Sequence, residues 1–222
     1  MPCDVGGRRY GEAMTETAAS FVDLRTEIPS CSTRRGRFDI VEVPPLQYLC
    51  IDGHGDPNTA PAYREALETL YPVAYHLKFF SKRELGRDYK MMPLEGLWWA
   101  DDLAVFTTRR DKTQWDWTLM ILVPDWITAA HVERAQDAVA DKAPRITELR
   151  LERYDEGMCV QTLHVGPYEA EGPVLEQMHD EFMPANGLRP TGKHHEIYLG
   201  DPRRAAPERL RTILRRPVTR IG

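Results

Sequence analysis

The chain has few cysteines, and no two of them form a CxxC pair. Cys3, Cys31, Cys50 and Cys159 are far apart in the 222-residue sequence. This spacing argues against a zinc knuckle and against a disulfide scaffold. Such usage fits a reducing cytoplasm, and we expect neither a bound metal nor a cofactor.

Long apolar runs and an excess of positive charge are also missing. No run approaches the length that crosses a bilayer, and the N-terminus has no apolar signal-peptide core. The formal net charge is -5, which argues against non-specific nucleic-acid binding because phosphates are neutralised by basic surfaces. We therefore expect a soluble cytoplasmic protein without direct contact to nucleic acid or membrane, whose partner is a small molecule.

Two familiar kinds of catalytic signature are absent as well. The turn at residues 53–58 (GHGDPN) has no third glycine and does not predict a dinucleotide-binding loop. No nucleophile elbow and no Cys–His pairing stands out, which argues against covalent catalysis.

The pattern of elements predicts one domain with an internal repeat. Residues 1–20 are small and polar and predict a disordered tail, in which Met14 is as plausible a start as Met1. Within the single domain expected at 21–222, the order strand, helix, strand, strand occurs at about 38–124 and again at about 148–218, with a linking helix at about 126–142. The best helix lies near residues 61–82, where apolar and aromatic residues recur at helical spacing.

This order predicts an α+β fold class. Two strand-helix-strand-strand modules would pair about a pseudo-twofold axis to form antiparallel sheets. We expect the helices to cover one side of the sheet and a ligand cleft to lie on the other side, where the halves meet.

The strand at residues 193–200 (KHHEIYLG) carries the most chemistry. A period of two places His194, Glu196 and Tyr198 on one face and His195, Ile197 and Leu199 on the other. We expect the second group to pack under helices and the first to line the cleft. The alternative is an edge strand whose polar face is only solvated.

Aromatic residues gather in a predicted hairpin of two strands, 91–99 and 115–123. Four of the five tryptophans lie there, and at least two of these must belong to the core. Flat apolar side chains suit a planar ligand because offset stacking adds to area burial. The candidate ligand-binding residues are Trp98, Trp99, Trp117, Met120, Phe106, Tyr75, Phe79, Tyr168 and His194.

Five segments together resemble one known family. They are FDIVEVP (38–44), IDGHGDPN (51–58), LEGLWW (94–99), WDWTLMI (115–121) and HHEIYLGDP (194–202). From about residue 21 to its end the chain resembles the GyrI-like small-molecule-binding proteins. The double Trp and the HHEIYL strand are most similar to the stand-alone branch, some of whose members are described as cyclopropanoid cyclopropyl hydrolases.

The resemblance implies a duplicated fold with an aromatic cleft and a carboxylate, at the position of Glu196, that contacts the ligand. Hydrolases of that branch open the strained ring of DNA-alkylating antibiotics. No segment resembles the helix-turn-helix of the family's regulators, so direct transcriptional regulation is disfavoured.

The chemistry of such a reaction assigns roles to two residues. Opening a spirocyclopropyl dienone creates a phenolate, which requires a base to activate water and a donor near the dienone oxygen. Glu196 is the predicted base, desolvated by Trp98 or Trp99, and Tyr198 or a neighbouring His would orient the water or donate a proton.

Several alternatives stay open at this point. Glu196 could pair with Arg211 or Arg215 across the sheet, or it could be the electrostatic partner of cationic aromatic drugs in a binder without catalysis. An adaptor that inhibits another protein is a third class. A metal shared by His194, His195 and Glu196 is disfavoured because neighbouring strand residues point to opposite faces.

Overall fold

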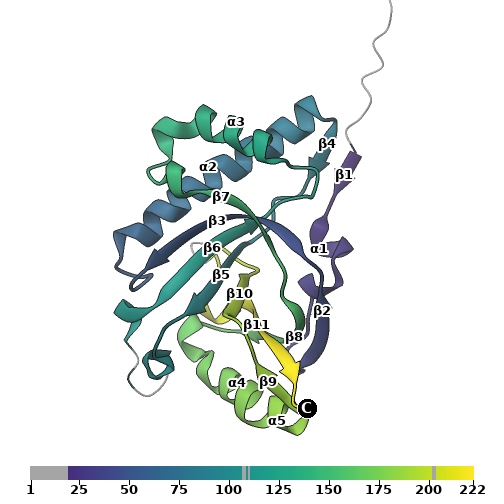
Figure 1. The fold of residues 1–222 in the computed structure, drawn as a ribbon, viewed down its shortest axis with the longest axis vertical. Coiled ribbons are helices and arrows are strands. Elements are labelled where there is room, and N and C mark those ends of the chain that lie inside the picture. The colour runs from purple at the N-terminus through teal and green to yellow at the C-terminus, as the bar shows by residue number, and fades with distance from the viewer. Residues whose placement is uncertain (1–19, 107–108, 110, 202–203) are drawn as a thin grey trace, which may run out of the picture.

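One large antiparallel sheet forms the frame of the molecule (Figure 1). The computed structural model describes residues 20–106, 109, 111–201 and 204–222, so the tail predicted at 1–20 lies almost entirely outside them. The strands of the sheet follow one another in the order β2 (Asp39–Val43), β8 (Gly157–Val165), β11 (Arg211–Arg220), β10 (His194–Tyr198), β5 (Leu94–Trp99), β6 (Asp116–Leu122), β3 (Leu46–His54) and β7 (Arg150–Tyr154). A short strand, β9 (Leu188–Pro190), pairs with β11.

This strand order contains the predicted internal symmetry. Each strand of the first half has a counterpart in the second half: β2 corresponds to β7, β3 to β8, β5 to β10 and β6 to β11. Replacing every strand by its counterpart gives the same strand order read from the other end of the sheet. The central pair is β5 with β10, in which Gly96 lies opposite Glu196. The outermost strands are swapped, since β2 pairs with β8 and β7 pairs with β3. The α+β fold class with two pseudo-symmetric modules is therefore confirmed.

The helices lie over the two ends of the sheet. The first half contributes α2 (Pro61–Glu84), which begins with proline in its first turn and continues past Pro72. After it come α3 (Ala129–Val139) and a 3₁₀ turn (Ala140–Lys142). The second half contributes α4 (Gly172–Glu176), a π-helical turn (Gln177–Phe182) and α5 (Met183–Ala185). None of the helices in the described part of the chain is long and apolar enough to cross a membrane.

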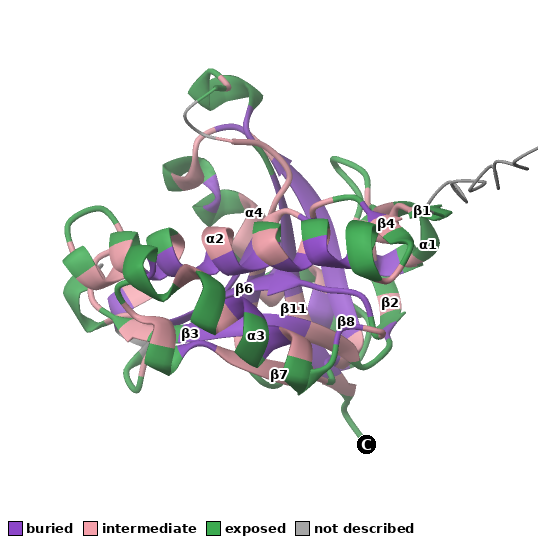
Figure 2. Cartoon of the chain, turned by 90° about the horizontal axis from the view of Figure 1, so that it is seen from above, coloured by how far each residue is buried: buried purple, intermediate pink, exposed green. Residues whose placement is uncertain are grey.

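One row of paired residues explains where the helices pack. The row crosses the four neighbouring strands β11, β10, β5 and β6 and consists of Leu214, Glu196, Gly96 and Leu119. Residues that lie opposite one another on paired strands share one face of the sheet. Leu214 belongs to the core beneath the π-helical turn and α5, whereas Leu119 belongs to the core beneath α2. Figure 2 shows the buried side of α2 turned towards the sheet. Helices thus cover both ends of this face and leave its centre, at Glu196, between them.

The N-terminal segment packs on part of the other face of the sheet. This segment contains β1 (Ser20–Val22), which pairs in parallel with β4 (Arg87–Tyr89), then α1 (Leu24–Glu27) and a 3₁₀ turn (Pro29–Cys31). Leu24, Ile28 and Cys31 pack against a second core cluster on this face. The prediction that helices cover one face and the cleft the other is therefore wrong in its second part. His195 and Ile197 pack away from the helices, and the cleft opens on the same face as the helices.

Candidate functional site

A cleft of about 1180 Å³ opens between α2 and the turn that precedes α4. Its floor is the exposed centre of the sheet, where β5 and β10 meet. Its walls are mainly aromatic and apolar and come from α2, from residues 90–94 and from residues 168–171 and 199–201. The residues of the floor and the aromatic wall are Trp98, Glu196, Tyr198, Tyr63, Tyr71, Tyr75, Trp115 and Tyr168.

Glu196 is held at the floor by its neighbours on the same face. The hydroxyl of Tyr198 donates to Glu196 Oε2 at 2.8 Å, and Trp98 Nε1 donates to the Tyr198 hydroxyl oxygen at 3.0 Å. His194 Nε2 lies 3.3 Å from Glu196 Oε1. A Cβ on Gly96, opposite Glu196, would come within 2.9 Å of Trp98 Nε1 and 3.2 Å of the Tyr198 hydroxyl. Glycine at this position therefore allows the Trp, the Tyr and the Glu to meet.

The phenols around Glu196 stay neutral. Burial, followed by the nearby Glu196 carboxylate, holds the pKa of Tyr198 well above its usual range. Burial, with Glu171 and Glu196 nearby, raises the pKa of Tyr168 to about 12. The rings of Tyr168 and Tyr198 meet edge to face at 5.5 Å. The Tyr198 hydroxyl therefore keeps its proton and donates it in the hydrogen bond to Glu196. This hydrogen bond fixes the orientation of the Glu196 carboxylate.

The structure brings five of the predicted residues together in this cleft, namely Glu196, Tyr198, Trp98, Tyr75 and Tyr168. Several other lining residues were not named as candidates by the sequence analysis, among them Tyr63, Tyr71, Trp115 and Glu171. The two tyrosines had a usable signal, since both lie on the stripe of α2 that includes Tyr75. Glu171 had none, because the turn that carries it has no periodicity.

The other predicted ligand-binding residues lie outside the lining of the cleft. Strand alternation places Trp99 and Met120 on the opposite face, where Met120 is buried and Lys193 Nζ lies 3.2 Å from the centre of the Trp99 ring. Trp117 is on the correct face but is fully buried beneath Tyr63, whose ring it meets edge to face at 5.2 Å.

Three further predicted residues lie near the cleft without lining it. Phe106 stacks on Trp115 at 4.8 Å and supports the wall from behind. His194 contacts Glu196 from the side. Phe79 is 44% exposed on α2, one turn beyond Tyr75.

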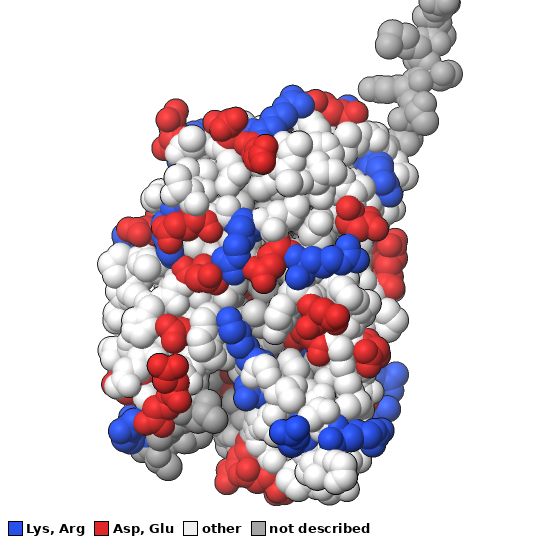
Figure 3. All heavy atoms as spheres, viewed as in Figure 1, with Lys and Arg blue, Asp and Glu red and all other residues white. Residues whose placement is uncertain are grey.

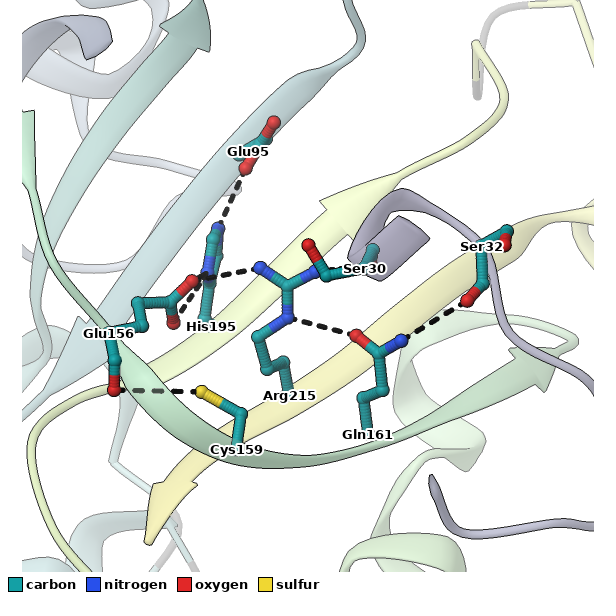
Figure 4. Close-up of polar contacts among 8 residues, drawn as sticks. All are labelled: Ser30, Ser32, Glu95, Glu156, Cys159, Gln161, His195 and Arg215. Carbon is teal, nitrogen blue, oxygen red and sulfur yellow. Dashed lines mark hydrogen bonds and ion pairs between the residues drawn. The ribbon is translucent and has the colours of Figure 1, made fainter. Parts of the chain in front are cut away.

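A network of buried charges lies on the other face of β10, behind Glu196 (Figure 4). His195 Nδ1 is 2.9 Å from Glu156 Oε1, and His195 Nε2 is 2.9 Å from Glu95 Oε2. Arg215 Nη1 donates to Glu156 Oε2 at 2.8 Å, and its Nε donates to Gln161 Oε1 at 3.0 Å. The sequence analysis missed this network, because it assigned His195 to an apolar packing face.

The network also attaches the N-terminal segment to the sheet. Arg215 Nη2 donates to the carbonyl of Ser30 at 2.6 Å, and Gln161 Nε2 donates to the carbonyl of Ser32 at 3.1 Å. Arg215 lies opposite His195 and therefore points away from Glu196. The suggested pairing of Glu196 with Arg215 is wrong for this reason.

His195 is an imidazolium in this environment. Both of its ring nitrogens face carboxylate oxygens, which can only accept hydrogen bonds when ionised, so both nitrogens must donate. Burial alone would lower the pKa of His195, but Glu156 and Glu95 outweigh it and raise that pKa to about 9. His195 and Arg215 in turn outweigh burial at Glu156 and lower its pKa to about 2. Two positive and two negative side chains thus balance in the interior.

We expect this network to make the folded state less stable in alkaline solution. Between pH 6.5 and 9 the unfolded chain has released the His195 proton while the folded protein retains it, so the free energy of unfolding should fall by up to about 1.4 kcal/mol per pH unit. The stabilisation is complete below pH 6.5 and is lost as the pH rises through 9. Urea unfolding of the wild type and of His195→Gln from pH 6.5 to 8.5 measures this slope. A wild type whose stability stays level over that range would contradict a charged His195.

Other sites on the surface give little indication of function. No group of three or more potential metal ligands lies together in the described ranges. Figure 3 shows acidic and basic side chains interspersed over one face of the molecule, without the basic stripe typical of nucleic-acid binding.

Comparisons with known proteins show the family and the fold. A family model described as the GyrI-like small molecule binding domain matches residues 37–218. An uncharacterised conserved protein from Listeria innocua has 37% sequence identity and a TM-score of 0.79, over 89% of this chain and 100% of that one. Another Listeria innocua protein, described as a hydrolase, has 36% identity and a TM-score of 0.78, over 90% of this chain and 100% of that one.

A more distant similarity concerns the fold alone. The C-terminal domain of EcmrR has 11% identity and a TM-score of 0.55, over 83% of this chain and 98% of that domain. No curated protein matches the chain by sequence.

Proposed function

Because the chain belongs to the GyrI-like small-molecule-binding family, we propose that its cleft binds bulky aromatic electrophiles and hydrolyses cyclopropanoid-type alkylating compounds. The observation that carries this proposal is the Glu196 carboxylate, which is oriented by Tyr198 at the floor of an aromatic cleft. The similarity to a Listeria innocua protein described as a hydrolase supports it. The biological role would be detoxification.

The proposed reaction adds one water molecule to the strained ring. Glu196 accepts a proton from water, and the water oxygen forms a bond to a ring carbon of the cyclopropane. The carbon–carbon bond that breaks gives its electron pair to the dienone, which becomes a phenolate. Glu196 then releases the proton that it accepted and the phenolate takes one up, so that the carboxylate is regenerated and the product is a phenol that carries the new hydroxyl group.

Tyr198 has a positioning role in this scheme. Its hydroxyl already donates to Glu196 and accepts from Trp98, so it is not free to donate to the dienone oxygen. We expect Tyr198→Phe to lower kcat by about tenfold to a hundredfold through loss of a hydrogen bond to a charged group, with a smaller change in KM.

Steady-state kinetics with a spirocyclopropyl dienone measures this effect. Tyr154→Phe, which removes a phenol hydroxyl from β7 outside the cleft, is the matched control. Equal rates for Tyr198→Phe and Tyr154→Phe would contradict the positioning role.

The second candidate function is binding without catalysis. Acidic and basic side chains both line the cleft, namely Glu68, Glu169, Glu171, Glu196 and Asp201 with Arg25, Lys90, Lys112, Lys142 and Arg204. A cationic aromatic drug would find stacking partners on the aromatic wall and the carboxylate of Glu196 at the floor. Such a protein would act as a sensor or would sequester its ligand.

One experiment separates the two functions. The pure protein is incubated with an excess of a spirocyclopropyl dienone, and the ring-opened product is followed by mass spectrometry. Several products per protein molecule support hydrolysis. Saturable quenching of tryptophan fluorescence, with no product above the uncatalysed rate, supports binding alone.

A further inference from the structure

The N-terminal segment is attached to the back of the sheet through its main chain. Arg215 donates to the carbonyl of Ser30, and Gln161 donates to the carbonyl of Ser32 (Figure 4). Of the described residues from 20 to 37, Ser30 is the one that is buried. We call residues 20–32 the strap, and these two hydrogen bonds hold its back end to the buried charge network.

The front end of the strap is attached to the chain that follows α2. β1 pairs in parallel with β4, and Lys90, directly after β4, donates its main-chain N–H to the carbonyl of Val22 at 2.8 Å. The ammonium of Lys90 also lies 2.8 Å from the carboxylate of Asp23. Figures 1 and 2 both show β1 and α1 beside β4. The strap therefore connects the network behind the sheet with the residues that follow β4.

The residues that follow β4 form one wall of the cleft. Residues 90–93 all line it. Met92 is 3% exposed and belongs to the second core cluster, against which Leu24, Ile28 and Cys31 of the strap pack. This wall thus has the cleft on one side and the strap on the other.

Between its two ends the strap is weakly held. The helix α1 is a single turn of four residues, none of which is buried. A helix of this length has no stability of its own, and segments with few buried side chains open locally at the lowest free energy. Release of the strap would uncover the apolar cluster that contains Met92 and Leu97, so the attached state is the major one.

We propose that the strap is a gate that acts on the cleft from behind. While it is attached, it holds residues 90–93 in place and narrows the cleft. When it is released, this wall becomes free to move and the cleft opens to ligands. The inference goes beyond the proposed function and rests on it only where ligand rates are measured. The released state is expected at about 0.1 to 10% of the molecules.

Ile28→Asp tests the gate because it favours the released state. The new carboxylate would lie in an apolar cluster without a partner, which is costly while the strap is attached. Thr26→Asp adds the same charge at an exposed position of α1 and is the matched control. Met91 is the reporter, since it lines the cleft and packs against the core beneath α2 and not against the cluster under the strap.

Methyl NMR of protein with ¹³C-labelled methionine observes this wall without any ligand. In Ile28→Asp the Met91 signal should move, whereas the signals of Met178 and Met183 in the core beneath α5 should keep their wild-type positions. Thr26→Asp should give the wild-type spectrum. Faster hydrogen exchange of the amides of residues 24–32 verifies that the strap is released. A released strap with an unchanged Met91 signal overturns the gate.

A milder variant keeps the test decisive if Ile28→Asp does not fold. Asp23→Ala removes the cap at the N-terminus of α1 and the ion pair with Lys90. Loss of a cap should speed the hydrogen exchange of residues 24–32 by about threefold to tenfold. The Met91 signal should move or broaden in the same variant. Faster exchange without any change at Met91 overturns the gate as well.

Ligand kinetics distinguish the gate from the proposed function. The probe is the ring-opened phenol of a compact spirocyclopropyl dienone, followed by stopped-flow quenching of tryptophan fluorescence. Because the open fraction rises from at most about a tenth to nearly all molecules, the association and dissociation rate constants should both rise about tenfold in Ile28→Asp, with little change in Kd. A rise in the dissociation rate constant alone contradicts the gate. If the phenol does not bind, the Met91 result still supports the gate and the proposed function alone fails.

Discussion

Glu196→Gln should abolish the proposed hydrolysis while the protein still binds its neutral substrate. General-base catalysis contributes about a hundredfold to ten-thousandfold, so kcat should fall by that range. The substitution preserves shape, and the Tyr198 hydroxyl can still donate to the amide oxygen of Gln. Single-turnover formation of ring-opened product from a spirocyclopropyl dienone, measured by mass spectrometry, gives the rate.

Binding measurements with the same variant separate the two candidate functions. If Glu196 is a base, the Kd for a neutral dienone should stay close to the wild-type value while the rate collapses. If Glu196 is only an electrostatic partner, the variant should bind cationic aromatic ligands more weakly than wild type does, and it should bind neutral ligands equally well. Glu133→Gln, on the exposed side of α3, controls for the loss of one negative charge. A Glu196→Gln variant with the wild-type rate rules out the assigned base.

The second large effect is expected from Arg215→Met. This change removes one of the two buried partners of Glu156, the other being His195, and leaves the acceptors of Gln161 and Ser30 without their donor. Breaking one side of a buried ion pair costs about 3 to 5 kcal/mol because a buried charge is left uncompensated. We therefore expect a loss of that size in the free energy of unfolding, measured with urea at pH 6.5.

A surface arginine provides the matched control. Arg150 pairs with Asp52 and Glu152, but its side chain is 40% exposed. Arg150→Met should therefore lower the free energy of unfolding by about 1 kcal/mol or less. If Arg215→Met proves too unstable to purify, Arg215→Lys keeps the charge but not the forked hydrogen bonds and should show an intermediate loss. Equal losses for Arg150→Met and Arg215→Met would contradict a stabilising network.

The network also bears on function through its place in the chain. His195 is adjacent to Glu196 on β10, so the ion pairs that hold His195 to Glu95 of β5 and to Glu156 fix the strand that carries the proposed base. The hydrolysis rates of variants of the network should therefore be compared at temperatures where these variants are fully folded.

Local sequence pattern was sufficient for the order of the main strands and helices and for the grouping of residues on β10, but not for the short elements β1, α1, β4 and β9. The period of a strand is two regardless of its surroundings, so His194, Glu196 and Tyr198 could be assigned to one face from the sequence. The helical stripe of α2 and the repeated order of elements are local properties in the same sense, and both were predicted. The residues of the cleft floor followed from these patterns.

Only the tertiary structure decided which face holds the cleft and which aromatic residues reach it. The packing of α2, the π-helical turn and α5 on one face leaves an opening between them, and strand alternation contains no information about that packing. Trp117 and Trp98 lie opposite each other on one face, yet Tyr63 covers Trp117. The partners of His195 likewise come from strands and loops 39 and 100 residues away, because cross-strand register, which depends on the whole sheet, brings these charges together.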